Sequence, residues 1–184
     1  MKKNLIACFT GMSLLLFMNM AANAQLSFVK TETSKTNPFN EATVTKDVSD
    51  NIEPGTVNHK AIKDFARSFK NANEKWYQVE NQFVAMFTLD DVSYQVAYDK
   101  KGNWLHTIRT YDETKLPRDI RHMVKSIYYD YDITQVQEVE MPYSIENPSS
   151  APVYIIHLDG KTDFINLRVC DGEMDEWQKL NKSK

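Results

Sequence analysis

Alternating apolar and polar residues, interrupted by very short turns, constrain the fold of this chain more than any other feature. The run FVAMFTL at 83–89 is followed, after Asp90-Asp91, by VSYQVAY at 92–98. A third run, 104–111, follows the turn DKKGN. A period of two residues is typical of strands with one buried side, and tight turns connect antiparallel strands. Residues 83–111 therefore predict an antiparallel meander.

Two other segments have the 3.6-residue period of amphipathic helices. NHKAIKDFARSFKNA predicts a helix near 58–70, with Asn58 as its N-cap and with Ile62, Phe65, Ala66 and Phe69 on one face. KLPRDIRHMVKSIYY predicts a second helix near 117–129. Pro117 suits a first helical turn, where an N–H group would have no partner. The apolar stripe of this helix consists of Leu116, Ile120, Val124 and Ile127.

The order of elements occurs twice. After the second helix, residues 133–141 predict a strand with a bulge, because Ile133, Val136 and Val139 break strict alternation. VYIIHLDG and FINLRVCDG then predict a hairpin. The sequence thus indicates an α+β fold built from two α-β-β-β pseudo-repeats. We expect a single antiparallel sheet of about six to seven strands, with two helices on one face.

The N-terminus has the pattern of an export signal. Lys2 and Lys3 precede an apolar run, and ANAQ indicates cleavage between Ala24 and Gln25. LIAC, ending at Cys8, resembles a lipoprotein cleavage box, but it would leave only three residues of hydrophobic segment before the cut. We predict a signal peptide at 1–24, a flexible polar leader at 25–57 with one strand in EATVTKDV, and a domain at 58–180. The expected location is periplasmic or secreted.

Charge and cysteine content exclude several classes of protein. Removal of Lys2 and Lys3 with the signal changes the formal net charge from -3 to -5, with no basic block for nucleic acid. No second apolar stretch approaches the roughly 20 residues of a membrane span. The mature chain retains only Cys170, so no internal disulfide forms, and we expect a monomer. Cys170 is predicted to be a small apolar side chain ending a strand, with a nucleophile or an intermolecular disulfide as alternatives.

No catalytic motif occurs in the sequence. G-x-S-x-G, H-E-x-x-H, C-x-x-C, the Walker loop and G-x-G-x-x-G are all absent. His122 has no histidine three or four residues away, so we expect no metal or other cofactor. Glu138 and Glu140 share a strand face, and we expect a solvated edge there rather than a glycosidase pair. The chain is predicted not to be an enzyme.

Several stretches resemble the PepSY-like family of exported proteins, which is also similar to beta-lactamase-inhibitory protein. The resemblance lies in FARSFKNANEKW, FVAMFTLD, YQVAYDKKGNWLHT, KLPRDIRHMV, VYIIHLDG and VCDG, and it covers residues 60–174. It implies an exported α/β sandwich without catalytic residues and with at most a binding or inhibitory role. None of the inhibitor's contact residues can be matched here, so inhibition of beta-lactamase is not implied.

The sheet face opposite the helices is the predicted binding surface. Strict alternation places six candidate residues on it: Gln95, Arg109, Ile155, His157, Asn166 and Arg168. We hypothesise that this face binds a periplasmic protein or peptide, with an ordinary solvated face as the equal alternative. Arg109, His157 and Arg168 would form a cationic patch that binds more strongly below roughly pH 6.5, unless Glu138 or Glu140 neutralises it in an internal network.

Two further functions stay open. A small-ligand carrier or envelope sensor would need an apolar pocket between sheet and helices, near Trp76 and Trp104. A peptidase inhibitor is implied only by the similarity to PepSY units in protease propeptides.

Overall fold

The computed structural model describes residues 52–143, 149 and 151–183. All of them belong to the unit that spans residues 48–184. The predicted signal peptide, its cleavage site, most of the leader and the strand expected in EATVTKDV lie outside the described residues.

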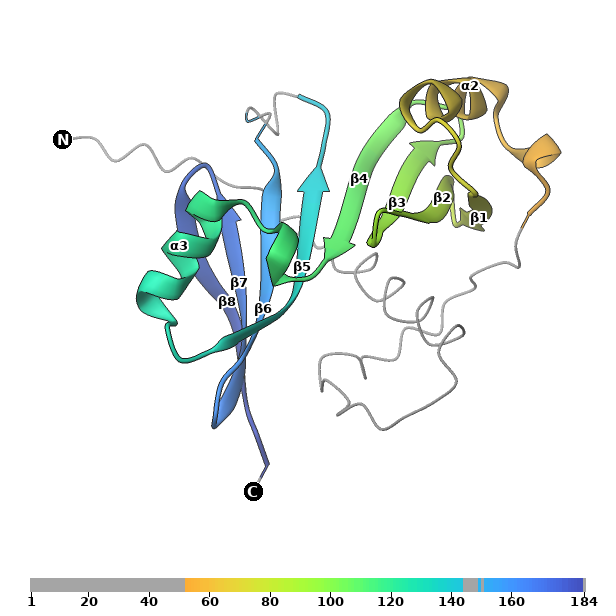
Figure 1. Ribbon diagram of the computed structural model, residues 1–184. Coiled ribbons are helices and arrows are strands. Elements are labelled where there is room, and N and C mark those ends of the chain that lie inside the picture. The colour runs from red at the N-terminus through yellow and green to blue at the C-terminus, as the bar shows by residue number, and fades with distance from the viewer. Residues whose placement is uncertain (1–51, 144–148, 150, 184) are drawn as a thin grey trace. The chain divides into compact units, whose positions relative to one another are not determined.

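Eight strands form one antiparallel sheet in which each strand lies beside its neighbour in sequence (Figure 1). The first half of the chain contributes the 3-10 turn η2 (Pro54–Thr56), helix α2 (His59–Ser68), β1 (Lys75–Val79), β2 (Gln82–Leu89), β3 (Val92–Asp99) and β4 (Trp104–Tyr111). The second half contributes η3 (Glu113–Lys115), α3 (Arg118–Ile127), β5 (Asp132–Glu140), β6 (Val153–Asp159), β7 (Asp163–Cys170) and β8 (Glu173–Asn181). Each half is a helix followed by four antiparallel strands.

The predicted fold class is confirmed, with a small difference in strand number. The prediction of six to seven strands missed β8, whose sequence EMDEWQKLN does not alternate between apolar and polar residues. Because β8 is the outer strand and is exposed along nearly its whole length, burial imposes no pattern on it.

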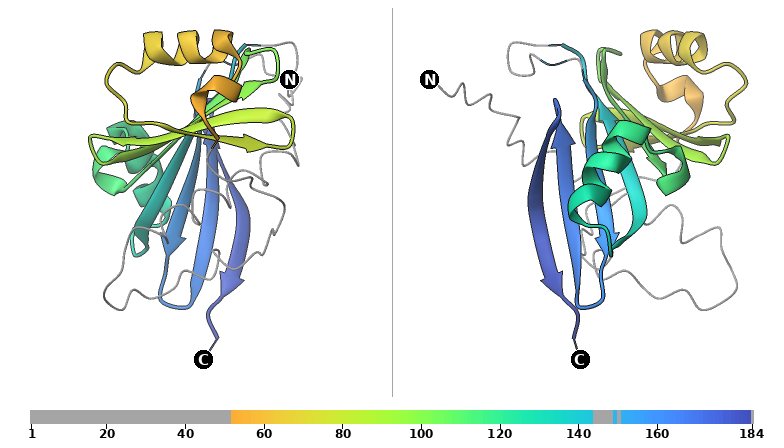
Figure 2. Two further views of the ribbon diagram at one scale, coloured as in Figure 1. Left: turned by 90° about the vertical axis from the view of Figure 1, so that its right-hand side faces the viewer. Right: turned by 60° about the vertical axis from the view of Figure 1, so that its left-hand side comes forward.

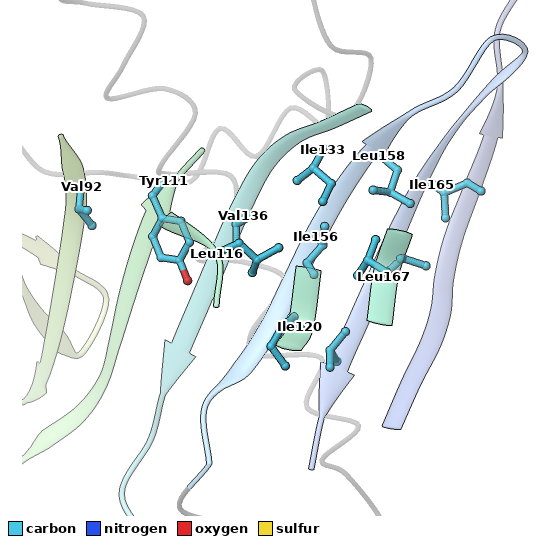
Figure 3. Close-up of a cluster of buried hydrophobic side chains, with 12 residues drawn as sticks. Val92, Tyr111, Leu116, Ile120, Ile133, Val136, Ile156, Leu158, Ile165 and Leu167 are labelled. Carbon is cyan, nitrogen blue, oxygen red and sulfur yellow. The ribbon is translucent and has the colours of Figure 1, made fainter. Parts of the chain in front are cut away.

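Both helices pack on the same face of the sheet, where they bury two apolar clusters (Figures 1 and 2). Helix α2 contributes Ala61 and Phe65 to the first cluster, which contains Ala85, Phe87, Val96 and Tyr98 of β2 and β3. Helix α3 contributes Ile120 and Val124 to the second, which Figure 3 shows on β5, β6 and β7. Tyr94 packs against both clusters. The inward residues predicted on β6 and β7 are confirmed: Tyr154, Ile156, Leu158, Ile165, Leu167 and Val169.

Helix α2 begins where its sequence predicts. The Asn58 side chain accepts a hydrogen bond from the backbone N–H of Lys60 at 2.9 Å, which confirms Asn58 as the N-cap. Phe65 anchors the helix, with its ring 5.5 Å from that of Trp76 and 5.4 Å from that of Phe87. Ala66, predicted on the apolar face, is instead exposed.

Helix α3 is shorter than predicted, because its last residue is Ile127 and Tyr128 already leaves helical geometry. Leu116, Ile120 and Val124 are buried as expected. Ile127 is 62% exposed, so its assignment to the apolar stripe is wrong. The stripe turns away from the sheet at the point where the helix ends.

The turn of residues 99–103 is fixed against the start of α2. Gly102 has φ +76°, and a Cβ atom there would lie 2.8 Å from Asn58 Oδ1 and 2.9 Å from Ala61 N. Asn58 Nδ2 also donates to the Lys100 carbonyl at 3.0 Å, and Lys60 Nζ donates to Asn103 Oδ1 at 2.5 Å. Glycine is needed here for both the left-handed backbone and the close approach of the helix.

Three register shifts determine which side chains share a face, and one of them lies between β7 and β8 at Asn166 and Leu167. The shift in β5, between Ile133 and Gln135, confirms the predicted bulge. A second shift lies between β3 and β4, where Ala97 pairs with His106 and Tyr98 pairs with Trp104. Trp104 therefore packs in the α2 cluster, whereas Ile108 lies on the opposite face.

Candidate binding face

We call the sheet face opposite α2 and α3 the free face. Strand register places side chains from all eight described strands on it. Its central residues are Val84, Met86, Ser93, Gln95, Ala97, His106, Ile108, Thr110, Gln135, Gln137, Val139, Val153, Ile155, His157, Asn166, Arg168, Asp175 and Gln178. Towards the strand ends and on β1, the same face carries Lys75, Tyr77, Thr88, Asp99, Asp132, Asp159, Phe164, Cys170, Glu173 and Leu180.

Five of the six predicted binding residues lie on the free face. Ile155 pairs with Arg168, and His157 pairs with Asn166, across β6 and β7. Gln95 lies further along the face, where it pairs with Ile108 of β4. Since paired residues of antiparallel strands project to the same side, these five side chains share one surface.

Arg109 does not lie on this face, so the predicted placement of Arg109, and of Thr107 beside it, is wrong. Arg109 pairs with Tyr94 on one side and with Glu138 on the other, and Tyr94 packs against both helix clusters. Strict alternation from Trp104 gave the wrong face, because the register shift next to Trp104 reverses the parity of β4.

Arg109 instead forms an internal network on the helix-bearing face. Its guanidinium nitrogens donate to Glu138 Oε1 at 2.5 Å and to Glu140 Oε2 at 2.8 Å. Tyr111 Oη donates to Glu138 Oε2 at 2.6 Å. The predicted cationic patch therefore does not exist. Glu138 and Glu140 do neutralise Arg109, but on the helix-bearing face and without His157 or Arg168, so the network expected on the free face is not present either. The solvated edge predicted at Glu138 is also wrong, because its side chain is only 14% exposed.

Charge on the free face lies on its outer strands and at the ends of the inner ones, where Asp99, Asp132 and Asp159 are found. Arg168 Nη2 donates to Asp175 Oδ2 of β8 at 2.8 Å, so the two charges are paired within the chain. Away from the strand ends, the central part from β3 to β6 consists in the described residues of aliphatic side chains, hydroxyls, amides and histidines. Gln95, Thr110, Gln137 and Asn166 are buried, as are Ala97, Ile108, Val139 and Ile155.

The two histidines of this face are neutral at physiological pH. Burial lowers the pKa of His106 to about 4. Burial also lowers the pKa of His157, against a hydrogen bond with Asn166 that raises it. The expectation that His157 becomes charged near pH 6.5 and strengthens binding is therefore wrong.

Gln137 is the feature of this face that sequence reasoning missed. It is 3% exposed, and its Oε1 atom has no hydrogen-bond partner among the described residues. Gln137 pairs with Thr110 on one side and with Ile155 on the other, which places it near the middle of the face. A buried carbonyl oxygen without a donor is destabilising, and such atoms are uncommon in folded proteins. Only the register between strands reveals its position.

The other residues considered as metal ligands or nucleophiles do not form a site in the described part of the chain. Residues 52–143, 149 and 151–183 contain no group of three or more His, Cys, Asp or Glu side chains that could hold a metal. His122 is exposed on α3. Cys170 is the buried last residue of β7, as predicted for a small apolar side chain. Among the described helices, none is long and apolar enough to cross a membrane.

Several solved structures from Bacteroides are similar to this chain. A BLIP-like protein from Bacteroides fragilis superposes with a TM-score of 0.54 at 17% identity, over 68% of this chain and 86% of that one. The fold is BLIP-like. A DUF2874 family protein from Bacteroides ovatus gives a TM-score of 0.54 at 17% identity, over 68% of this chain and 88% of that one. A protein from Bacteroides eggerthii, named as a candidate periplasmic protein, gives 0.52 at 14% identity over 68% and 88%.

These likenesses establish the fold and nothing more, because all the identities are below 25%. No family model matches the chain, and a search of curated proteins finds no match.

Proposed function

We propose that this chain is an exported, non-catalytic module that binds a protein or peptide partner through the free face of its sheet. One observation carries the proposal. Both helices pack on the other face, while the centre of the free face gathers aliphatic side chains and uncharged hydrogen-bonding groups, including two buried amide oxygens without a partner among the described residues, Gln137 Oε1 and Asn166 Oδ1. Interfaces commonly combine such an apolar centre with a polar rim.

The size of the face favours a polypeptide. It extends from β2 to β8, which corresponds to roughly 30 Å at the usual spacing of strands. A small ligand would instead need a concave pocket that surrounds most of its surface. Partly exposed residues surround the buried centre and would form the rim: Met86, Ser93, Gln135, Val153, His157 and Arg168.

The predicted export signal and the similarity to other proteins also support the proposal. The predicted signal peptide at 1–24 directs the chain to the periplasm or beyond, where the Bacteroides eggerthii neighbour is also placed by its name. The PepSY-like resemblance and the likeness to a BLIP-like protein both favour binding over catalysis.

Site-specific photo-crosslinking tests the proposal. The mature chain, residues 25–184, carries a photoreactive residue at Gln135 on the free face or, as the control, at His122 on the exposed side of α3. In envelope extract we expect specific cross-linked products from Gln135 and none from His122. The same products from both positions, or products from His122 alone, would contradict binding through the free face.

A further inference from the structure

The two halves of the sheet are joined by one short ladder, between β4 and β5. Five residue pairs form it, from Tyr111 with Val136 to Thr107 with Glu140. Before Thr107, residues 104–106 of β4 pair with β3 and not with β5, which ends at Glu140 (Figure 1). The ladder therefore has an open end at Thr107 and Glu140, where the two strands separate, and a closed end at Tyr111 and Val136.

Apolar packing secures the closed end of this ladder better than the open end. Tyr111 and Val136 belong to the same buried cluster, that of α3. Tyr94 is the one described side chain that packs against both helix clusters. At the open end, the pair that faces the helices consists of Thr107 and Glu140, which are polar. Something other than apolar contact must hold the strands together there.

Arg109 lies next to the open end and binds β5 through two carboxylates. Its Nη1 atom is 2.5 Å from Glu138 Oε1, and its Nη2 atom is 2.8 Å from Glu140 Oε2. A planar guanidinium fixes the geometry of the groups that it binds better than a flexible ammonium does. The Arg109 and Glu138 side chains are only 28% and 14% exposed, so salt screens this pair only in part. Without Arg109, two carboxylates would remain side by side on β5, one of them largely buried.

We propose that Arg109 is a positioning residue for the free face. By binding Glu138 and Glu140, it keeps β4 and β5 paired to the end of their ladder and fixes the angle between the two halves of the sheet. Partly exposed residues of the free face lie on both halves, for example Ser93 on β3 and Gln135 on β5. A partner that contacts both halves then binds only when this angle is maintained. This last step rests on the function proposed above.

Distances between two spin labels measure the angle in the free protein. Labels at Lys101 and Glu173, exposed positions on either side of the open end, are attached to ketone-bearing amino acids so that no thiol is needed. In Arg109→Gln their mean distance should increase by roughly 5 Å, about one strand spacing, and its distribution should broaden. Labels at Thr88 and Lys161, near the closed end, should keep their distance.

A second arginine serves as the matched control for these distances. Arg168 is 29% exposed, nearly the same as Arg109, and its side chain also binds a carboxylate across an antiparallel pair of strands. Its partner is Asp175 of β8, so this ion pair lies within one half of the sheet. Arg168→Gln should therefore leave both label distances unchanged.

A milder variant keeps the test independent of folding. Glu140→Ala removes the ion pair at the open end and leaves Arg109 bound to the more buried Glu138. Circular dichroism should show the native fold, while the label distance at the open end should still increase. Hydrogen exchange in residues 104–109 and 136–141 should become faster in this variant, and about tenfold faster in Arg109→Gln.

Photo-crosslinking in envelope extract relates the angle to binding. The mature chain carries a photoreactive residue at Ser93 or at Gln135, one on each half of the free face. The yield of the specific product should fall at both positions in Arg109→Gln. It should stay unchanged in Arg121→Gln, because the ion pair of Arg121 with Glu113 joins α3 to η3 and does not cross the ladder.

Several results would overturn the inference. Unchanged distances at the open end in both Arg109→Gln and Glu140→Ala would show that the ladder stays closed without the ion pairs. An equal shift at the closed end, or in Arg168→Gln, would indicate a general loosening of the sheet instead. A longer distance with unchanged cross-linking would remove the positioning role and leave the proposed function intact. If the unmodified chain gives no cross-linked product, the proposed function fails, and the positioning role fails with it.

Discussion

Replacing Gly102 by alanine tests the close contact between the 99–103 turn and helix α2. Gly102 and Gly172 have nearly the same backbone conformation, with φ of +76° and +78°. A Cβ atom at Gly172 would meet nothing within 4 Å, whereas at Gly102 it would lie 2.8 to 2.9 Å from three atoms of residues 58–61. Gly172→Ala is therefore a matched control that includes the backbone cost and excludes the collision.

The two costs can be separated. A left-handed conformation costs an L residue about 1–2 kcal/mol, and the lower entropy of the unfolded alanine chain offsets about 0.4–1 kcal/mol of this. Gly172→Ala should thus lower the free energy of unfolding by roughly 1 kcal/mol. Gly102→Ala adds overpacking against the backbone of Ala61, worth about 1–3 kcal/mol, for a total near 3 kcal/mol.

Urea denaturation followed by far-UV circular dichroism measures both values. With a slope of about 2 kcal/mol per molar urea, the midpoint of Gly102→Ala should fall about 1 M below that of Gly172→Ala. Hydrogen exchange should also accelerate at the first turn of α2 in Gly102→Ala alone. Equal midpoints for the two variants would show that the turn moves away from the helix at no cost and would refute the packing argument.

Three further predictions concern titration and metal. The folded-state pKa of His106 is lowered by burial to about 4, below its usual value near 6.5, so the free energy of unfolding should fall as pH decreases from 6.5 to 4. His106→Gln should reduce this slope in pH-dependent urea titrations, and His122→Gln, at an exposed position, should leave it unchanged. Burial, and then the hydrogen bond to Glu138, raise the pKa of Tyr111, so stability should fall as pH rises above about 10. Tyr111→Phe should reduce this alkaline loss and lower stability at pH 7 by about 1–2 kcal/mol, because the hydrogen bond to a carboxylate is removed; an unchanged alkaline slope would contradict the assignment. EDTA should leave the melting temperature unchanged, and a fall of several degrees would indicate a metal.

The elements that could be predicted are those with one buried side, because burial there requires apolar residues at regular intervals along the sequence. Phe87, Val96, Ile156 and Leu167 all lie on the predicted side, because each belongs to a strand that alternates without interruption. The helices were located by the same principle and by local signals such as the Asn58 cap. Strand β8 was not predicted, because an exposed outer strand has no buried side and its sequence need not alternate between apolar and polar residues.

The candidate site was predictable only in part. Gln95, Ile155, His157, Asn166 and Arg168 were placed correctly because their strands keep the expected parity up to those positions. Arg109 was misplaced by a register shift that depends on how β3 and β4 pair, which periodicity within one strand does not encode. The importance of Gln137 is likewise a property of its neighbours on two other strands.

The strictly sequential order of strands has a consequence for how the chain folds. Every strand in the described sheet pairs only with the strands adjacent to it in sequence, so most contacts form between residues that are close along the chain. Low contact order of this kind is associated with rapid folding for a sheet protein. Helix α2 with β1 to β4 can close while the rest of the chain is still being synthesised. A pause at this stage leaves β4 as an unpaired edge, open to aggregation until β5 arrives to cover it.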